Sequence, residues 1–554
     1  MAAIEAAKYG VHVTLVDKGL MGRSGSSPTG DGVMSAPFAG TALEGDAERD
    51  SAERFFEDTL RGGEHVNDAR LVAAMAAEAT RVVREMETFG VRFSRVGSGE
   101  VFQYRTLGHR YARACGPLGG GRAFMDALRK ETLHRNVVVV QDTMITRLLV
   151  RDGAVVGAYG VHTGDGEEAV FTAPAVVLAA GSATRLYRYA SASYQTTGDS
   201  FVLGYAAGVP LASMEFVEFT IIPKVGPKLM FSSGISPFMG RGSRLYNDAG
   251  ERFMERYDPE QRERTTRARL IRAVYRELEA GRGPVWNDAT HFPDEVWREF
   301  AESSDGVLHK LRAAGIDYRR DRFEWSPAVH TYLGGLRIDP SGATEVPGLF
   351  AGGETAAGVH GANRLSDNAI TECVVFGKRA GRTAARYARA QREPGDAAAL
   401  VAAARDEVRA VTRDRGEAPA AVEKAIRATA WRCAGVVRDA RLLAEGRDRF
   451  REARAVPLRA RDLCDVVMAL ELRNLALIGE IVCASALRRE ESRGQHYRDD
   501  FSERRADGER WIVAVPAPAG PAFHDTDVPG HGLGFHEALA QANATTAGQH
   551  AMTD

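Results

Sequence analysis

The apolar residues of this chain recur with two different spacings. Residues 66–90, 120–134 and 262–280 carry apolar side chains three and four positions apart, which predicts amphipathic helices. Residues 137–140, 145–150 and 154–163 are short apolar runs separated by glycine-containing turns, as in β-strands. A further apolar run from Val176 ends at Gly181 and predicts a buried strand. The pattern therefore predicts a chain that mixes helices with strands.

Residues 1–17 have the pattern of a helix followed by a strand. Residues 1–10 form a helical stretch that ends at Gly10, and residues 11–17 alternate and are rich in β-branched side chains. Asp17 closes this strand, where an acidic side chain suits the ribose hydroxyls of an adenine dinucleotide. A dinucleotide-binding fold places a strand and a GxGxxG loop before such a helix, and this sequence has neither.

The missing first strand leads to an expectation about the gene. Such a strand is central in its sheet, so its loss would leave backbone groups unpaired on both neighbouring strands. We expect the natural product to begin about 15–30 residues upstream of Met1. An in-frame stop codon directly before Met1, with no glycine-rich codons, would contradict this expectation. The alternative is a genuinely shortened protein that binds no flavin.

The composition argues against several classes of protein. With 554 residues, 44% of them apolar, the chain can bury the cores of several domains. Its 72 basic and 74 acidic residues nearly cancel, which gives no electrostatic reason to expect nucleic acid or an anionic membrane as a partner. No apolar run approaches the length of a membrane span, about 18 residues, and the N-terminus lacks the pattern of a signal peptide. We therefore expect a cytoplasmic protein without a transmembrane segment.

The cysteines and histidines predict no metal site. Five cysteines stand far apart without a CxxC motif, so no iron–sulfur cluster, haem attachment or redox dithiol is expected. The histidines after residue 520 lack the spacing of metal ligands. Electrons would therefore leave the protein through a separate electron-transfer subunit, through a diffusible acceptor or to oxygen.

The segment from Gly352 to Leu365 combines small residues, a carboxylate and an arginine. It reads Gly352-Gly353-Glu354 and then, three residues later, Gly358-Val359-His360-Gly361-Ala362-Asn363-Arg364-Leu365. The glycines let the backbone approach a bulky cofactor, and Glu354 can accept hydrogen bonds from ribose or ribityl hydroxyls. Arg364 presents a planar fork that suits a carboxylate. An ordinary strand, turn and helix would show a similar pattern.

This segment resembles the GLYAxGE…GVHGANRL pattern of the flavoprotein subunits of succinate dehydrogenase and fumarate reductase, and of L-aspartate oxidase. The resemblance runs from Ala2 to about Trp511, with the motifs in the family's order. It implies an α/β fold, in which an α+β capping domain interrupts a Rossmann-like FAD-binding domain and a C-terminal helical domain follows. We accordingly expect an FAD-binding domain in residues 1–219 and 329–390, a capping domain in 220–328, a helical domain in 395–511 and a flexible tail in 512–554.

The resemblance also implies which residues would hold FAD. They lie in a loop of small residues, after apolar strands and at the starts of helices: Asp17, Ser24, Gly30, Gly32, Gly181, Asp199, Gly353, Glu354, Asn368, Ala369 and Ile370. In the membrane-bound relatives a histidine of an RSHT loop bonds covalently to FAD, and Gly25 stands at that position here. We therefore expect FAD to bind non-covalently. The alternatives are a plain surface loop for residues 23–32 and a helix N-cap for Asp199.

The reaction of this family adds or removes two hydrogens across a carbon–carbon bond beside a carboxylate. Negative charge builds up on that group in the transition state, so cations aimed at it accelerate the step, and a positioned acid or base completes it. By resemblance, Arg267 would carry the proton, while His330 and Arg364 would hold the carboxylate or carbonyl of the substrate. The alternatives are a solvated helix face for Arg267, a buried core histidine for His330 and a structural salt bridge for Arg364.

The sequence departs from the family where substrate is bound. The family's QFHPT reads Glu218-Phe219-Thr220-Ile221-Ile222 here, so a hydroxyl replaces a substrate-binding histidine. Losing a charged hydrogen bond costs about 1.5–3 kcal/mol of binding. A dianion such as succinate or fumarate should then bind poorly unless Arg241, in the segment that corresponds to the family's RGEGG, compensates.

These observations predict an FAD-dependent oxidoreductase that desaturates, or saturates, a small carboxylate-bearing molecule. One alternative is an oxygen-using amino-acid oxidase similar to L-aspartate oxidase. Another is a flavin-free partner protein without catalytic activity.

Overall fold

Two pairs of short parallel strands carry the segments that the sequence relates to a dinucleotide. The structure is a computed structural model that describes residues 1–551 apart from 39–48, 98, 107, 227, 230–234, 393–394 and 412. Strand β1 (Thr14–Val16) pairs with β4 (Val138–Val140), and β8 (Val176–Leu178) pairs with β16 (Leu349–Ala351). Within the described residues no hydrogen-bonded strand joins the two pairs, so the expected further strand stays a prediction.

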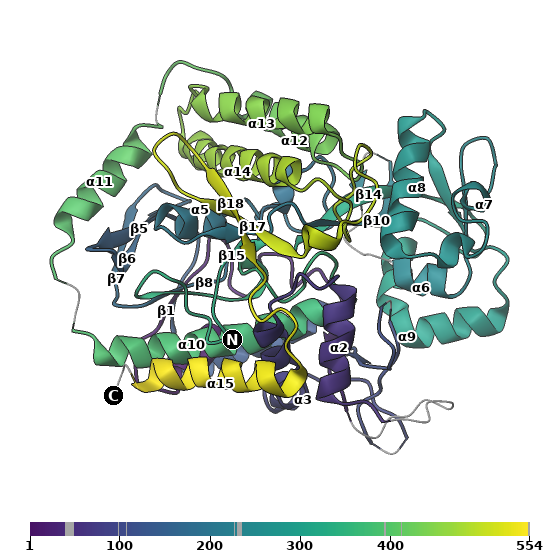
Figure 1. The fold of residues 1–554 in the computed structure, drawn as a ribbon, viewed down its shortest axis with the longest axis horizontal. Helices are drawn as coiled ribbons and strands as arrows, with labels where there is room; N and C mark the ends of the chain where they lie inside the picture. The colour runs from purple at the N-terminus through teal and green to yellow at the C-terminus, as the bar shows by residue number, and fades with distance from the viewer. Residues whose placement is uncertain are drawn as a thin grey trace.

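Helices pack around these strands. Helix α10 (Asn368–Ala390) contacts both α1 (Ala2–Ala7) and α3 (Ala69–Thr88), and it crosses the lower part of the molecule in Figure 1. The apolar spacing correctly predicts α3 and α4 (Gly120–His134). The other elements of this part are α2 (Ala52–Gly62), α5 (Asp199–Ala206), β2 (Met34–Ser35), β3 (Ala114–Cys115), β5 (Thr143–Arg151), β6 (Ala154–His162) and β7 (Glu168–Thr172). The structure thus confirms the α/β class.

A separate five-stranded sheet begins near the predicted start of the capping domain. Its strands follow the order β11-β10-β14-β13-β12, with bounds Lys228–Leu229, Val217–Val225, Phe323–Tyr332, Val285–Asp288 and Arg244–Tyr246. Helices α6 (Ile235–Gly240), α7 (Met254–Tyr257), α8 (Arg267–Glu279) and α9 (Asp294–Ala313) lie beside it, on the right in Figure 1. The long helix expected over 262–280 starts later, because the Thr266 side chain accepts the Arg269 N–H and caps α8.

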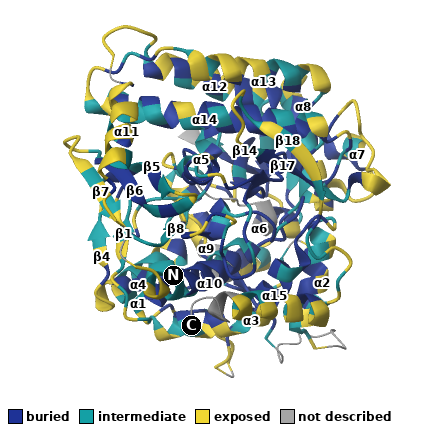
Figure 2. Ribbon diagram, turned by 60° about the vertical axis from the view of Figure 1, so that its left-hand side comes forward, coloured by how far each residue is buried: buried dark blue, intermediate teal, exposed yellow. Residues whose placement is uncertain are grey.

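The segment after residue 395 is helical, as its composition predicts. Helices α11 (Ala398–Arg409), α12 (Pro419–Cys433), α13 (Ala440–Ala455) and α14 (Leu463–Arg488) make up this segment. Their outer faces are exposed, whereas α14 turns buried residues toward the interior (Figure 2). None of the helices in the described ranges combines the length and apolar character that a membrane crossing needs.

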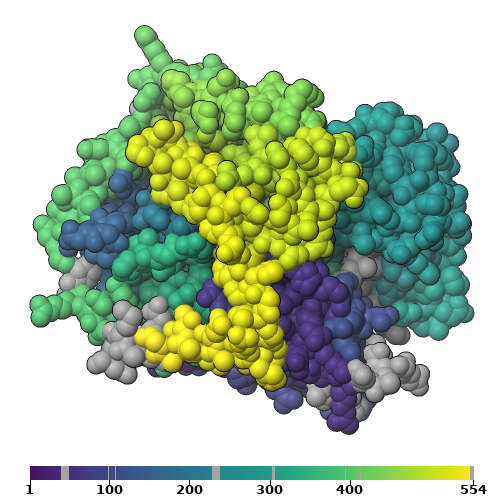
Figure 3. All heavy atoms as spheres, in the orientation of Figure 1, coloured from purple at the N-terminus to yellow at the C-terminus, as the bar shows by residue number. Residues whose placement is uncertain are grey.

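The expectation of a flexible tail over residues 512–554 is wrong for its described part. Strands β17 (Arg510–Val515) and β18 (Ala522–Asp527) extend a sheet of β15 (Gly335–Leu336) and β9 (Leu211–Ala212). Helix α15 (Phe535–Ala551) packs on α3, and the last residues form a band across the face in Figure 3. The reason is that small alanines permit close helix packing, with Ala538 and Ala542 fully buried. Residues 552–554 lie outside the described part.

A matched pair of substitutions tests the packing of α15. Ala538→Asp places a carboxylate in the buried interface, whereas Ala540→Asp makes the same change at an exposed position. We expect the buried change to weaken the docking of α15 by about 2–3 kcal/mol. Amide hydrogen exchange in α15 should then be roughly thirtyfold or more faster in Ala538→Asp. Equal exchange rates in the two variants would contradict the packing described here.

Candidate active site

A β-bulge sets the position of His330. Strands β10 and β14 pair in antiparallel fashion, with Glu218 opposite Thr331 and Phe219 opposite Val329. His330 is therefore the extra residue on β14, and bulges of this kind re-aim side chains next to active sites. The Nδ1 atom of its ring lies 2.7 Å from the Ser191 hydroxyl oxygen, which orients the ring.

Glu218 is the centre of a buried charged cluster. Its Oε1 accepts hydrogen bonds from Arg267 Nη1 at 2.5 Å and from Arg364 Nη2 at 3.2 Å, and its Oε2 accepts one from Arg364 Nε at 3.0 Å. Burial raises the pKa of Glu218, but the two guanidinium groups outweigh burial and lower this pKa to about 2. The cluster therefore holds two positive charges and one negative charge at neutral pH.

Arg267 reaches this cluster from the first turn of α8. A cation at a helix N-terminus is opposed by the helix dipole, so its position depends on its partners. These are Glu218 and the Ser366 hydroxyl, which accepts a hydrogen bond from Nη2 at 2.7 Å. The Arg267 side chain is 13% exposed, whereas that of Arg269 on the same helix is 57% exposed. The alternative of a solvated face is therefore wrong for Arg267 and right for Arg269.

Two histidines beside the cluster are uncharged at neutral pH. Burial lowers the pKa of His330 to about 4, with Arg364 and Arg267 acting in the same direction and Glu218 against it. Burial and Arg364 lower the pKa of His360 to about 3. The buried His360 Nδ1 has no hydrogen-bond partner among the described residues. Because an unpaired buried nitrogen is costly, this atom is suited to bind a small molecule.

The ends of β8 and β16 are joined by hydrogen bonds through Thr355. Its Oγ1 accepts the N–H of Gly181 and donates to the Gly181 carbonyl, both at 3.1 Å. Gly181 and Gly353 have φ angles of +78° and +73°, a region that favours glycine. These glycines follow the carboxyl ends of neighbouring parallel strands, which is where α/β folds bind ligands.

Glu354 connects this region to the strand that carries His330. Its Oε1 accepts hydrogen bonds from the Ser182 hydroxyl at 2.6 Å and from the Tyr332 N–H at 3.1 Å. Burial raises the pKa of Glu354. Tyr332 lies two residues after His330 on β14. Its hydrogen bond therefore connects Glu354, which is predicted to bind FAD, to the strand that carries His330, which is predicted to bind substrate.

The N-terminus of α10 follows directly on the loop that contains Arg364. Asn368 is its first residue, and Ala369 and Ile370 complete the start of the helix. The Nδ2 atom of Asn368 donates to Thr59 Oγ1 at 3.3 Å, while its buried Oδ1 has no partner among the described residues. The free N–H groups and the dipole of a helix N-terminus favour negative charge. This helix end can therefore stabilise an anionic part of a cofactor.

A second ion-pair network surrounds Asp199. Lys18, the residue after Asp17, donates to Asp199 Oδ2 at 2.7 Å and to Glu471 Oε1 at 2.8 Å. The N-cap of α5 is Gly198, so the N-cap alternative for Asp199 is wrong. Glu471 belongs to α14, and the network thus ties the helical segment to the end of β1. A contact between Asp199 and the cofactor stays a prediction.

The loop of small residues between 23 and 32 is held against other elements. Gly30 accepts the Gly121 N–H at 3.0 Å at the start of α4, and a Cβ on Gly32 would lie 2.9 Å from the Gly121 backbone. The Gly25 N–H donates to Gln195 Oε1 at 2.9 Å, and Ser24 Oγ accepts a backbone N–H at 2.6 Å. The loop is therefore anchored to α4 and to Gln195, and its contact with FAD stays a prediction.

The described contacts of Arg241 are with α9. Its Nη2 donates to Glu299 Oε1 at 3.2 Å, and its guanidinium lies over the Phe300 ring at 4.6 Å. Both partners belong to α9. These contacts do not support the expectation that Arg241 replaces the missing substrate histidine.

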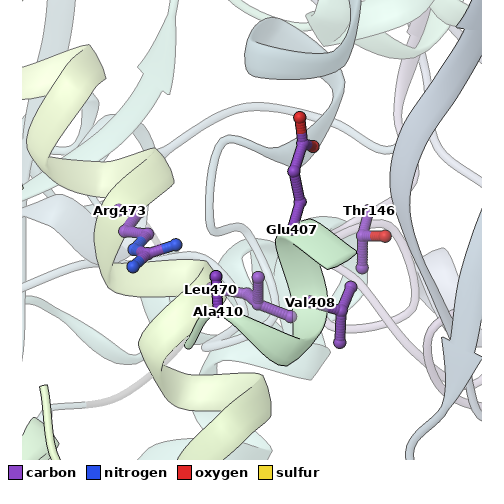
Figure 4. Close-up of a pocket in the computed structure, with 6 residues that line it drawn as sticks. All are labelled: Thr146, Glu407, Val408, Ala410, Leu470 and Arg473. Atoms are coloured by element: carbon purple, nitrogen blue, oxygen red, sulfur yellow. The ribbon is translucent and has the colours of Figure 1, made fainter. Parts of the chain in front are cut away.

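A pocket of about 210 Å³ lies elsewhere in the molecule, between β5, α11 and α14 (Figure 4). Its lining consists of Thr146, Glu407, Val408, Ala410, Leu470 and Arg473. None of these is a predicted site residue, so this pocket is separate from the candidate active site.

Glu218 is the important cluster residue that the motifs do not identify as functional. It interrupts the apolar run from Phe216 to Ile222, in a strand that is buried along most of its length. A charge in such a strand must be paired, so the interruption itself is the signal. The contributions of Ser191, Ser366 and His360 depend on contacts between distant segments, which motif spacing does not show.

Comparisons with known proteins relate the chain to FAD-binding proteins. A family model described as FAD binding domain matches residues 1–370, and one described as Fumarate reductase flavoprotein C-term matches residues 423–517. A fumarate reductase (CoM/CoB) subunit of Methanothermobacter marburgensis is 36% identical, over 92% of this chain and 94% of that protein. L-aspartate oxidase 2 of Ralstonia nicotianae is 32% identical, over 84% of each. The structure of Mycobacterium smegmatis Sdh1 in complex with UQ1 matches with a TM-score of 0.83 and 31% identity, over 95% of this chain and 91% of that chain.

The neutral state of His330 predicts a pH dependence of stability. An unfolded histidine has a pKa near 6.5, and His330 in the fold has a pKa of about 4. Its contribution to stability is fully present above pH 6.5 and is lost as the pH falls toward 4, by about 3 kcal/mol. Urea unfolding of flavin-free protein at several pH values should show this loss.

A matched pair of variants measures the share of this loss that belongs to His330. His330→Asn should reduce the fall in the free energy of unfolding between pH 6.5 and 4 by about 3 kcal/mol, while the buried His109 and His360 keep their own contributions. His134→Asn, at a histidine that is 78% exposed, should leave the fall unchanged. An unaltered slope in His330→Asn would contradict a buried neutral ring.

Proposed function

Because this chain belongs to the family of FAD-binding flavoproteins that includes fumarate reductase and succinate dehydrogenase flavoprotein subunits and L-aspartate oxidase, we propose that it is an FAD-dependent oxidoreductase acting on a carbon–carbon bond. The reaction would add or remove two hydrogens beside a carboxylate of a small substrate. The observation that carries this proposal is the meeting of Arg267, Arg364 and His330 around Glu218. These residues come from three segments that are far apart in the sequence.

The residues present are suited to hold FAD. Gly181, Gly353 and Glu354 lie at the ends of two parallel strands, and the buried Asn368 Oδ1 lacks a partner among the described residues. Asp17 directly follows β1, where it can meet the ribose hydroxyls of an adenine nucleotide. When bound, FAD accepts or supplies a hydride. Gly25 in place of the relatives' histidine supports non-covalent binding.

Each residue of the cluster has a separate task in this proposal. Arg364 and the neutral ring of His330 would hold the carboxylate or carbonyl and stabilise the charge that develops there. Arg267 would move the proton at the neighbouring carbon. An arginine is normally always charged, so its partners, Glu218 and Ser366, must keep it oriented and shielded from water.

The proposal also covers the cell compartment and the acceptor of the electrons. All five cysteines are free thiols, which agrees with the reducing cytoplasm. Since relatives are named as subunits, a separate electron-transfer subunit is one acceptor for the electrons, and a diffusible carrier is the other. The amino-acid oxidase alternative is less favoured, because the fumarate reductase subunit of Methanothermobacter marburgensis is more similar to this chain than L-aspartate oxidase 2 is. Hydrogen peroxide released with amino acids would favour the oxidase.

The first test is spectroscopic. Protein reconstituted with FAD should show a flavin absorption spectrum, and a substrate among mono- and dicarboxylates should bleach it or restore it. Protein that stays colourless with excess FAD would favour the flavin-free alternative and contradict the proposal.

Arg267→Lys tests the proton-transfer role. Lysine keeps the charge but loses the planar fork that bonds Glu218 and Ser366 together, so turnover should fall by about a hundredfold or more while FAD stays bound. Stopped-flow measurement of flavin reduction or reoxidation provides the rate. Arg269→Lys, on the exposed face of the same helix, should keep the normal rate. A near-normal rate in Arg267→Lys would remove this residue from the mechanism.

A further inference from the structure

Glu218 occupies the binding edge of Arg364 that a substrate carboxylate would use. The Nε and Nη2 groups of Arg364 form the fork that matches a carboxylate in two-point fashion, and both donate to Glu218. A substrate can therefore approach only the other N–H groups of Arg364, such as Nη1, which donates to the Leu365 carbonyl at 3.2 Å. The carboxylate of Glu218 thus takes the place on Arg364 that a substrate carboxylate could otherwise occupy.

Arg267, Arg364 and Glu218 together carry an excess of one positive charge. Arg267 and Arg364 carry two positive charges, and Glu218 carries one negative charge. The groups facing them include His330 on β14, His360 and Asp367 in the loop before α10, Glu354 after β16, and His109, whose Nε2 lies 2.8 Å from the Ser366 carbonyl oxygen. The three histidines are neutral, and burial raises the pKa of Asp367 and of Glu354. Among the described residues, the basic groups that act most on Glu218 are Arg364, Arg267 and the neutral His330, so these groups offer no second excess charge for a dianion.

Glu218 cannot easily leave this position. Its side chain is fully buried, and its backbone lies in the paired part of β10 opposite Thr331. A buried carboxylate deprived of its partners is strongly destabilising, so an incoming carboxylate would not displace it. A substrate with two carboxylates would instead place both of them near the fixed carboxylate of Glu218. Like charges repel more strongly in such a low-dielectric site than in water.

We propose that Glu218 selects substrates by charge, so that the site accepts a molecule with a single carboxylate and rejects dicarboxylates. This inference rests on the proposed function, and it names the class of substrate for the same site. The retained carboxylate, or a carbonyl conjugated with it, would face Arg267, Arg364 and His330. The far end of the substrate would be uncharged.

Crotonate and fumarate test this selection. They share the same trans double bond and one carboxylate, and crotonate has a methyl group where fumarate has its second carboxylate. Neither reacts with oxidised flavin, so binding to the oxidised holoenzyme can be followed through the flavin absorption spectrum. We expect the wild-type protein to bind crotonate at least tenfold more tightly than fumarate.

Glu218→Gln keeps the size of the side chain and removes its charge. We expect this variant to shift the ratio of the two dissociation constants at least tenfold toward fumarate. Glu324→Gln makes the same change on the same sheet, at a glutamate that pairs with Lys224, and should leave the ratio unchanged. Glu218→Asp keeps the charge and should keep the preference for crotonate, which provides a second comparison if Glu218→Gln does not fold.

The outcomes separate this inference from the proposed function. A wild-type holoenzyme that binds fumarate as tightly as crotonate, or that binds neither acid, overturns the selection by charge. An unchanged ratio in a folded Glu218→Gln variant overturns it as well. Failure to bind FAD, or flavin that no carboxylic acid reduces or reoxidises, would instead refute the proposed function.

Discussion

The contact of one buried carboxylate with two arginines is the constraint on which the site depends. Glu218 is placed by the pairing of β10 with β14, Arg267 by the start of α8, and Arg364 by the loop before α10. Burying any of these charges alone would cost several kcal/mol. The segments that carry them must therefore come together for the fold to be stable, and the same pairing brings together the groups that we propose to act on a substrate. In this proposal, stability and function depend on the same few hydrogen bonds.

Some parts of this arrangement could be predicted from the sequence, because they are local. Apolar side chains repeat at the helical spacing over α3 and α4, and the glycines at 181 and 353 mark turns with positive φ. The residues Arg267, His330 and Arg364 are found through motifs, and the structure does bring them together. Their roles stay predictions, since position alone does not show chemistry.

Other parts depend on contacts between distant segments and left no local pattern. The residues after 511 contain few large apolar side chains, yet Val513 is fully buried and Phe535 lies against Phe56. Small alanines on α15 then pack on α3, so a composition that suggests flexibility belongs to an ordered helix. The expected role of Arg241 stays a prediction. Its place in the motif did not show that its guanidinium would lie over Phe300.

The charged cluster also explains why neutral histidines suit this site. Burial and the nearby arginines keep His330 and His360 uncharged, so neither adds to the positive charge that draws a substrate. A neutral ring can still donate or accept a hydrogen bond in a fixed direction. The arginines can then attract a negatively charged substrate, and the histidine rings can orient it. A protonated histidine would combine these two tasks. In the proposed reaction, an excess of one positive charge would stabilise the charge that develops on one carboxylate or carbonyl, and Glu218 would keep the excess from becoming larger.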